Sequence, residues 1–111
     1  MVDITINYLD CCDKPSLYTV KVIYESNHDL ESLRICRNCG AYWFYRFHEY
    51  VSFYGDDDIT VWYSPLTKDE AERIENAEDR PELSFLKNRE SFMEDSQGVK
   101  KVKGQPDFPW S

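Results

Sequence analysis

The chain has 111 residues, a net charge of −8 and 41% hydrophobic residues, which is typical of one folded domain and too apolar for a disordered segment. No stretch approaches the roughly 18 apolar residues of a membrane span, and the N-terminus lacks the pattern of a signal peptide, so we expect a cytoplasmic protein without a membrane partner. The negative charge makes nucleic acid an unfavourable partner and favours a basic protein.

The first part of the chain has the alternating pattern of β-strands. Residues 2–8 and 17–24 each place apolar side chains on one face and polar side chains on the other. Residues 9–16 have the composition of a turn around a pair of cysteines. Residues 30–35 are expected to form a hairpin with 17–24 across the polar turn at 25–29, so these segments predict an antiparallel sheet.

A long aromatic strand is predicted over residues 41–54, and a returning strand over 59–63 follows the turn at 55–58. The odd positions of the aromatic strand, such as Trp43, are expected to face the core. Two interpretations stay open for the even positions. They form either a surface covered by Leu83, Leu86 and Phe92 of the C-terminal helices or an exposed recognition platform.

Two helices are predicted after the strands. Thr67 and Glu70 have the spacing of a capping box, which starts a helix over residues 68–78. A second cap and a proline near its first position predict another helix over residues 81–94, and Gly98 is expected to end it.

The expected fold class is therefore α+β, with a small antiparallel sheet followed by two C-terminal helices. Residues 1–95 are expected to form one domain, in which 1–64 supply the sheet with its cysteines and 65–95 supply the helices. Residues 96–111 are expected to be a flexible tail.

Four cysteines occur in two tight pairs, Cys11-Cys12 and Cys36-Arg-Asn-Cys39-Gly40. Paired thiols in a chain without a secretion signal indicate metal binding more often than disulfides. A Cys-x-x-Cys turn presents two sulfurs to one ion, and the glycine lets the chain leave the turn without a clash. Residues 8–63 resemble a zinc ribbon, most specifically at 36–45, which match the start of its second half. This resemblance implies a zinc-ribbon-like sheet held by structural zinc.

The ligand set stays open, because adjacent side chains such as Cys11 and Cys12 point to opposite faces of an extended strand unless the backbone turns sharply. One alternative is zinc held by Cys11, Cys12, Cys36 and Cys39. A second is zinc held by Cys36, Cys39, one of the first pair and His28 or His48, and a third is no metal. A site with three or four thiolates has no open position for water, so zinc is expected to be structural.

We expect a non-enzymatic protein. The sequence contains no glycine-rich phosphate loop and no serine nucleophile elbow. Neither histidine has an evident acidic partner, since His48 and Glu49 point to opposite faces of a strand.

The chain resembles small bacterial immunity proteins in size, acidity and scarcity of motifs, which implies that it neutralises a basic partner such as a nuclease toxin. The expected partner-binding residues are Tyr42, Tyr50, Tyr54, Trp62, Asp56, Asp57, Asp58, Glu70, Glu75, Glu78 and Glu82. The alternative is a zinc-ribbon adapter for nucleic acid or transcription machinery, which would use Arg34, Arg37, Arg46 and the C-terminal lysines.

Overall fold

The computed structural model describes residues 4–5, 9–50, 58–78, 83–86, 89–95 and 98–103. The strands are β1 (Ile4–Thr5), β2 (Ser16–Glu25), β3 (Asp29–Cys36), β4 (Tyr42–Tyr50), β5 (Asp58–Leu66), β6 (Glu90–Asp95) and β7 (Gly98–Lys103). The helices are α1 (Lys68–Asn76) and the short 3-10 helix η1 (Ser84–Leu86).

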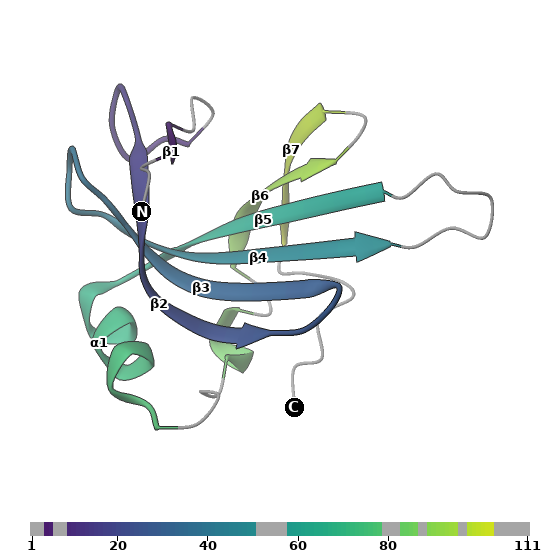
Figure 1. Ribbon diagram of the computed structural model, residues 1–111. Coiled ribbons are helices and arrows are strands. Elements are labelled where there is room, and N and C mark those ends of the chain that lie inside the picture. Colours follow the sequence, from purple (N-terminus) through teal and green to yellow (C-terminus); the bar gives the residue numbers. More distant parts are fainter. Residues whose placement is uncertain are drawn as a thin grey trace.

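All seven strands belong to one antiparallel sheet, in which they lie side by side in chain order from β1 to β7. Figure 1 shows the sheet twisted, with α1 and η1 together on one side of its central strands. Because each strand pairs with the next one in sequence, the fold is a β-meander that needs no crossover connection.

One face of the sheet, which we call the helix face, packs against α1 and η1. Its side chains pack against the apolar side of α1, where successive turns supply Ala71 and Ile74. The buried cluster consists of Leu33, Phe44, Ala71, Ile74, Leu83 and Leu86.

The opposite face, which we call the cysteine face, carries a second cluster. Since successive strand residues point to opposite faces, β4 buries Phe44 on the helix face and Trp43 on the cysteine face. The loop between β1 and β2 covers part of this cluster, and Cys11 and Cys12 of that loop pack against it. The buried members are Leu9, Leu17, Cys36, Trp43, Tyr45 and Tyr63.

Several local predictions are confirmed. The strands expected at 17–24, 30–35 and 59–63 are present as β2, β3 and β5, and the capping box of Thr67 and Glu70 starts α1. The expected strand 2–8 is described at Ile4–Thr5, and the expected strand 41–54 is described as far as Tyr50.

The predicted α+β architecture with two C-terminal helices is wrong. The segment expected to be a helix over 81–94 contains η1 and strand β6, and Gly98 begins β7 instead of ending a helix. The free edge of β5 overrides the local helical pattern, because Val61–Tyr63 pair with residues 92–94 and the ring of Phe92 packs 6.2 Å from that of Trp43.

The C-terminal segment differs from the expectation in a second respect. Residues 98–103, expected to belong to a flexible tail, pair with β6 along the whole of β7. The even positions of β4 are covered as one interpretation proposed, since Phe44 contacts the cluster of Leu83 and Leu86. Phe92, however, lies on the cysteine face.

Candidate metal centre

The fold brings the four cysteines together from two distant segments. Cys11 and Cys12 lie in the loop before β2, Cys36 ends β3 and Cys39 lies in the turn before β4. Their four sulfurs all lie within 4.8 Å of one another, and the Sγ atoms of Cys12 and Cys36 are 3.8 Å apart. Tetrahedral zinc with Zn–S bonds of about 2.3 Å holds its sulfurs roughly 3.8 Å apart, so the spacing is compatible with one metal ion.

The turn after β3 has the backbone of a metal-binding knuckle. The N–H of Gly40 donates to the carbonyl of Cys36 at 2.8 Å, and the N–H of Cys36 donates to the carbonyl of Ala41 at 2.8 Å. Gly40 has a φ of 79°, a conformation that glycine adopts without a steric penalty. The glycine after the second cysteine therefore lets the chain reverse and enter β4.

The loop that carries Cys11 and Cys12 is held beside this turn by two hydrogen bonds and by one buried side chain. Residues 10–14 form a continuous bend, which is the sharp turn that two adjacent cysteine ligands require. The side-chain amide of Asn38 donates to the carbonyl of Lys14, and the N–H of Arg37 donates to the carbonyl of Ser16 at 2.7 Å. Leu9 is buried at the start of the loop and anchors it to the sheet.

The pKa values of the Cys36 and Cys12 thiols are shifted in opposite directions. Burial opposes ionisation of Cys36, but backbone N–H groups of Ser16, Cys39 and Asn38 outweigh it and lower the pKa of this thiol to about 6. Burial and the neighbouring thiol of Cys36 raise the pKa of Cys12. The thiol of Cys36 therefore ionises more readily than that of Cys12.

Burial raises the pKa of Cys11 as it does that of Cys12, but one contact opposes this effect. Burial and the thiol of Cys39 raise the pKa of Cys11, whereas the indole of Trp43 lowers it. Cys36 is buried, Cys11 and Cys12 are partly buried, and Cys39 is exposed. The centre is thus closed toward the sheet and open to solvent at Cys39, which provides a path for an ion to enter.

The structure does not bring a histidine to this group. Within the described ranges, the four cysteines form the group of potential ligands, and His28 and His48 are not part of it. The ligand set with one histidine is therefore not the one that the fold assembles.

Each histidine instead has a carboxylate partner, so the expectation that both lack one is wrong. Nδ1 of His48 lies 2.5 Å from Oδ1 of Asp29, and Nδ1 of His28 lies 3.0 Å from Oε1 of Glu49. Asp29 is directly opposite His48 in the pairing of β3 with β4. These partners could not be recognised in the sequence, because they lie far apart along the chain and are brought together by the register of β3 and β4.

Two of the expected partner-binding side chains are buried. Trp62 is 2% exposed, and the guanidinium of Arg46 lies 4.6 Å from the centre of its ring. Glu70 is 8% exposed and accepts hydrogen bonds from both terminal nitrogens of Arg89. Neither side chain presents itself to a partner in this structure.

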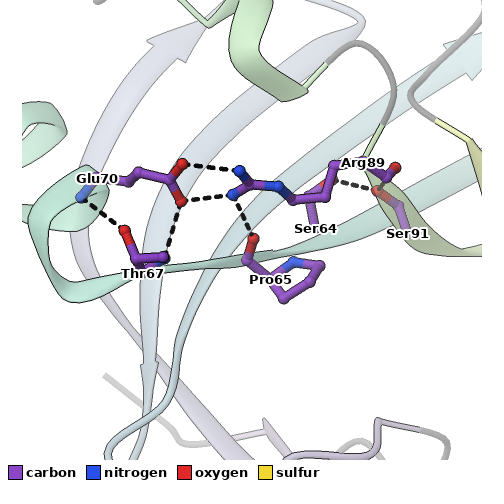
Figure 2. A network of polar contacts seen from close by, with 6 residues as sticks. All are labelled: Ser64, Pro65, Thr67, Glu70, Arg89 and Ser91. Carbon is purple, nitrogen blue, oxygen red and sulfur yellow. Dashed lines mark hydrogen bonds and ion pairs between the residues drawn. The ribbon is translucent and has the colours of Figure 1, made fainter.

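Figure 2 shows the network that holds Glu70. Its Oε1 accepts from the N–H of Thr67 at 2.8 Å, while Arg89 also donates to the carbonyl of Pro65 at 3.0 Å. The hydrogen bond from Arg89 outweighs burial and lowers the pKa of Glu70 to about 2. Glu70 thus ties the first turn of α1 to the segment that precedes β6.

The remaining expected partner residues are distributed as follows. Tyr42 is half-buried against the helix-face cluster, and Glu75 and Glu78 are exposed on and after α1. Tyr50 ends β4 and Asp58 begins β5. Tyr54, Asp56, Asp57 and Glu82 lie outside the described residues.

The arginines of the nucleic-acid alternative are not gathered on an open surface, whereas Lys100, Lys101 and Lys103 are exposed on β7. Arg34 is 8% exposed with its guanidinium 3.7 Å from the centre of the Tyr45 ring, and Arg46 is 3% exposed. Arg37 is exposed beside Tyr18. Two of the three arginines are therefore not placed to contact phosphates.

The chain matches no protein-family model, no curated protein and no solved structure. None of the helices in the described part of the chain combines the length and apolar character needed to cross a bilayer.

Proposed function

We propose that the protein is a zinc-stabilised binding protein. One structural Zn²⁺ is held by Cys11, Cys12, Cys36 and Cys39, and the outer surface binds a basic protein in the cytoplasm. The observation that carries the metal assignment is the convergence of four thiols within 4.8 Å of one another.

Zinc is favoured over other ions by the chemistry of the ligands. Four sulfur ligands at tetrahedral spacing suit zinc or iron, and they do not suit magnesium or calcium, which prefer oxygen. None of the four cysteines is paired in a disulfide, and a reducing compartment keeps thiols in this state. A closed set of four thiolates leaves no position for a reacting water, which supports a structural role.

Native mass spectrometry of the purified protein tests the metal assignment. We expect one zinc ion per chain, lost in the Cys36→Ser, Cys39→Ser double variant. The matched control is the His28→Ala, His48→Ala double variant, which removes the alternative ligands and is expected to retain zinc. Zinc retained by the first variant, or lost from the second, would contradict the assignment.

Two surface features support binding to a basic protein. The first is the exposed side of α1, which carries Asp69, Glu72 and Glu75 and is followed by Glu78. Together with the net charge of −8, these acids attract a cationic partner and speed its encounter.

The second feature is an apolar row across the cysteine face, at the end away from the cysteines. Leu30, Phe47 and Val61 are cross-strand neighbours in β3, β4 and β5, and Glu94 and Val99 continue the row. Val99 is 42% exposed at one end of the row.

Other exposed side chains enlarge this row. Ile59 is 47% exposed beside it, and Glu49 pairs with Ile59 across β4 and β5. Glu25 pairs with Leu30 at the other end. An apolar strip bordered by glutamates suits a partner that presents an apolar anchor among basic residues.

The particular role that we propose is neutralisation of a basic toxin, such as a nuclease, by an acidic immunity protein. Acidity and the acidic face of α1 support this role. The expected partner is encoded beside this protein and has a basic C-terminal domain, and it should co-purify with the protein from the native host.

Binding kinetics with that partner test the surface assignment. The Glu72→Lys, Glu75→Lys, Glu78→Lys variant is expected to slow association at least about tenfold at low salt, and reversal of Asp56, Asp57 and Asp58 is the second charge variant. The Ile59→Ser, Val99→Ser variant should mainly speed dissociation. Tyr24→Ser is the control, because Tyr24 is 40% exposed but pairs with Glu31 on the helix face.

The absence of any basic partner, or association that is unaffected by both charge variants, would contradict the binding proposal. Binding to an oligonucleotide that weakens steeply with salt would favour the adapter alternative instead.

A further inference from the structure

Trp43 lies directly beside the cysteine centre and is held rigidly there. It is 2% exposed and belongs to the same buried cluster as Cys36, against which Cys11 and Cys12 pack. The ring of Phe92 lies 6.2 Å from its own at an interplanar angle of 54°, so neighbouring side chains fix the orientation of the indole.

The indole N–H of Trp43 has no hydrogen-bond acceptor among the described residues, although it is completely buried. A buried donor left without an acceptor costs about 1–3 kcal/mol, and such a group in a folded protein calls for an explanation. Cys11 packs against the cluster to which Trp43 belongs, and the indole lowers the pKa of the Cys11 thiol, which burial raises.

Backbone donors act on two of the other sulfurs. Backbone N–H groups of Ser16, Asn38 and Cys39 act on Cys36, and that of Lys14 acts on Cys12. For Cys11, the N–H group that lowers the pKa of the thiol is the indole of Trp43. Backbone N–H groups therefore affect the thiols of Cys36 and Cys12, whereas a side-chain N–H affects the thiol of Cys11.

These donors matter because the loaded centre is anionic. Four thiolates around one Zn²⁺ carry a net charge of about −2, which a half-buried site cannot hold without N–H groups around the sulfurs. Groups that donate to metal ligands commonly change the affinity for the metal by 10- to 100-fold when they are removed.

We propose that Trp43 is a positioning residue of the metal centre, whose indole N–H donates to the Cys11 thiolate when the metal is bound. This inference rests on the proposed zinc centre and assigns its missing donor. It also gives the buried indole N–H an acceptor.

The test compares Trp43→Phe with Trp62→Phe. Both substitutions keep an aromatic ring and remove a buried indole N–H without an acceptor, but Trp62 faces Arg46 and does not belong to the cysteine cluster. We expect Trp43→Phe to weaken zinc binding by about 10- to 100-fold in competition with a chromophoric chelator. Trp62→Phe should change zinc binding less than twofold.

Cobalt substitution supplies a readout that a general loss of packing would not change. With Co²⁺ in the site, loss of a hydrogen bond to a thiolate is expected to move the sulfur-to-cobalt charge-transfer band to longer wavelength. The visible bands of tetrahedral cobalt should keep their intensity, since the four ligands remain. The band should shift in Trp43→Phe and stay in place in Trp62→Phe.

If Trp43→Phe does not fold, the indole at position 43 is replaced by its benzothiophene isostere, which has sulfur in place of N–H and nearly the same shape. Unchanged affinity and an unchanged charge-transfer band in either substitution overturn the proposal for Trp43. Failure of the wild-type chain to bind zinc or cobalt overturns the zinc centre itself, so the two failures are distinguishable.

Discussion

The two faces of the sheet are completed by different means. The helix face is covered by the helices α1 and η1. Hydrogen bonds between Glu70 and Arg89 join α1 to the segment that precedes β6. The cysteine face is covered near β1 by a loop over residues 9–15 without regular secondary structure. A loop of this kind has few backbone hydrogen bonds of its own, so a metal cross-link contributes most on that side.

Removal of the metal is expected to have the largest effect and to act on the cysteine face alone. Treatment of the zinc-loaded protein with a chelator should destabilise it by about 3 kcal/mol or more, which corresponds to a fall in Tm of at least roughly 10 °C. Calorimetry measures this change. Hydrogen exchange should show protection lost in residues 9–15 and 36–40 while α1 keeps its protection.

The Cys36→Ser variant is the control for this experiment, because its stability should not respond to the chelator. A chelator that leaves the Tm of the wild-type protein unchanged, or that unprotects α1 first, would show that the two faces are not independent.

On the helix face, Glu70→Gln is expected to cost about 2–3 kcal/mol in urea unfolding. Glutamine still completes the capping box with Thr67, so the substitution isolates the loss of charge opposite the partly buried Arg89. Glu72→Gln, exposed on the same helix, should change stability by less than about 0.5 kcal/mol. Equal stabilities of the two variants would rule out Glu70 as the anchor of α1.

The same carboxylate makes the helix face sensitive to acid. The pKa of Glu70 is about 2 in the folded chain and 4.5 at its ordinary value, so its stabilisation is complete above pH 4.5 and is lost as the pH falls toward 2. From pH 5 to pH 3 the wild-type protein should lose about 2 kcal/mol more than Glu70→Gln does. Parallel urea titrations at both pH values measure this difference, and identical losses would contradict it.

The smallest effect is expected at the other end of α1. The ammonium of Lys21 on β2 donates to the carbonyls of Ile74, Glu75 and Ala77 at 3.1, 3.1 and 2.6 Å. Lys21→Met should cost about 1 kcal/mol, because a cation there satisfies carbonyls at the negative end of the helix. Lys68→Met, at the opposite end of the helix, should cost nothing, and a similar loss in both would contradict the assignment.

The sequence predicted the features that depend on neighbouring residues. The capping box needs only Thr67 and Glu70, which lie three residues apart, and the Cys-x-x-Cys turn needs only five consecutive residues with Gly40 at the end. Alternation of apolar side chains was enough to place β2, and the turn composition of residues 25–29 and 55–58 placed the strands that follow, β3 and β5. The spacing of the cysteines was enough to identify both pairs as parts of a candidate metal site.

The predictions that failed concern residues whose partners lie far along the chain. Leu83, Leu86, Phe92 and Met93 fit a helical period, but the open edge of β5 recruited the last two residues into a strand. The carboxylates of Asp29 and Glu49 became partners of the histidines through the register of β3 and β4. Burial of Glu70 by Arg89 could not be read from a sequence in which Glu70 is simply one of many acids.

By itself, the sequence determined the local units of this protein: the strands β2 to β5, the helix start and the two cysteine pairs. Those units are set by steric alternation and by hydrogen bonds between residues a few positions apart. Only the tertiary structure decided that both faces of the sheet are covered, that the vicinal cysteines meet the knuckle, and that Trp43 is buried in the cluster against which Cys11 packs. The reason is physical, since strand register and packing join residues whose separation along the chain carries no periodic signal.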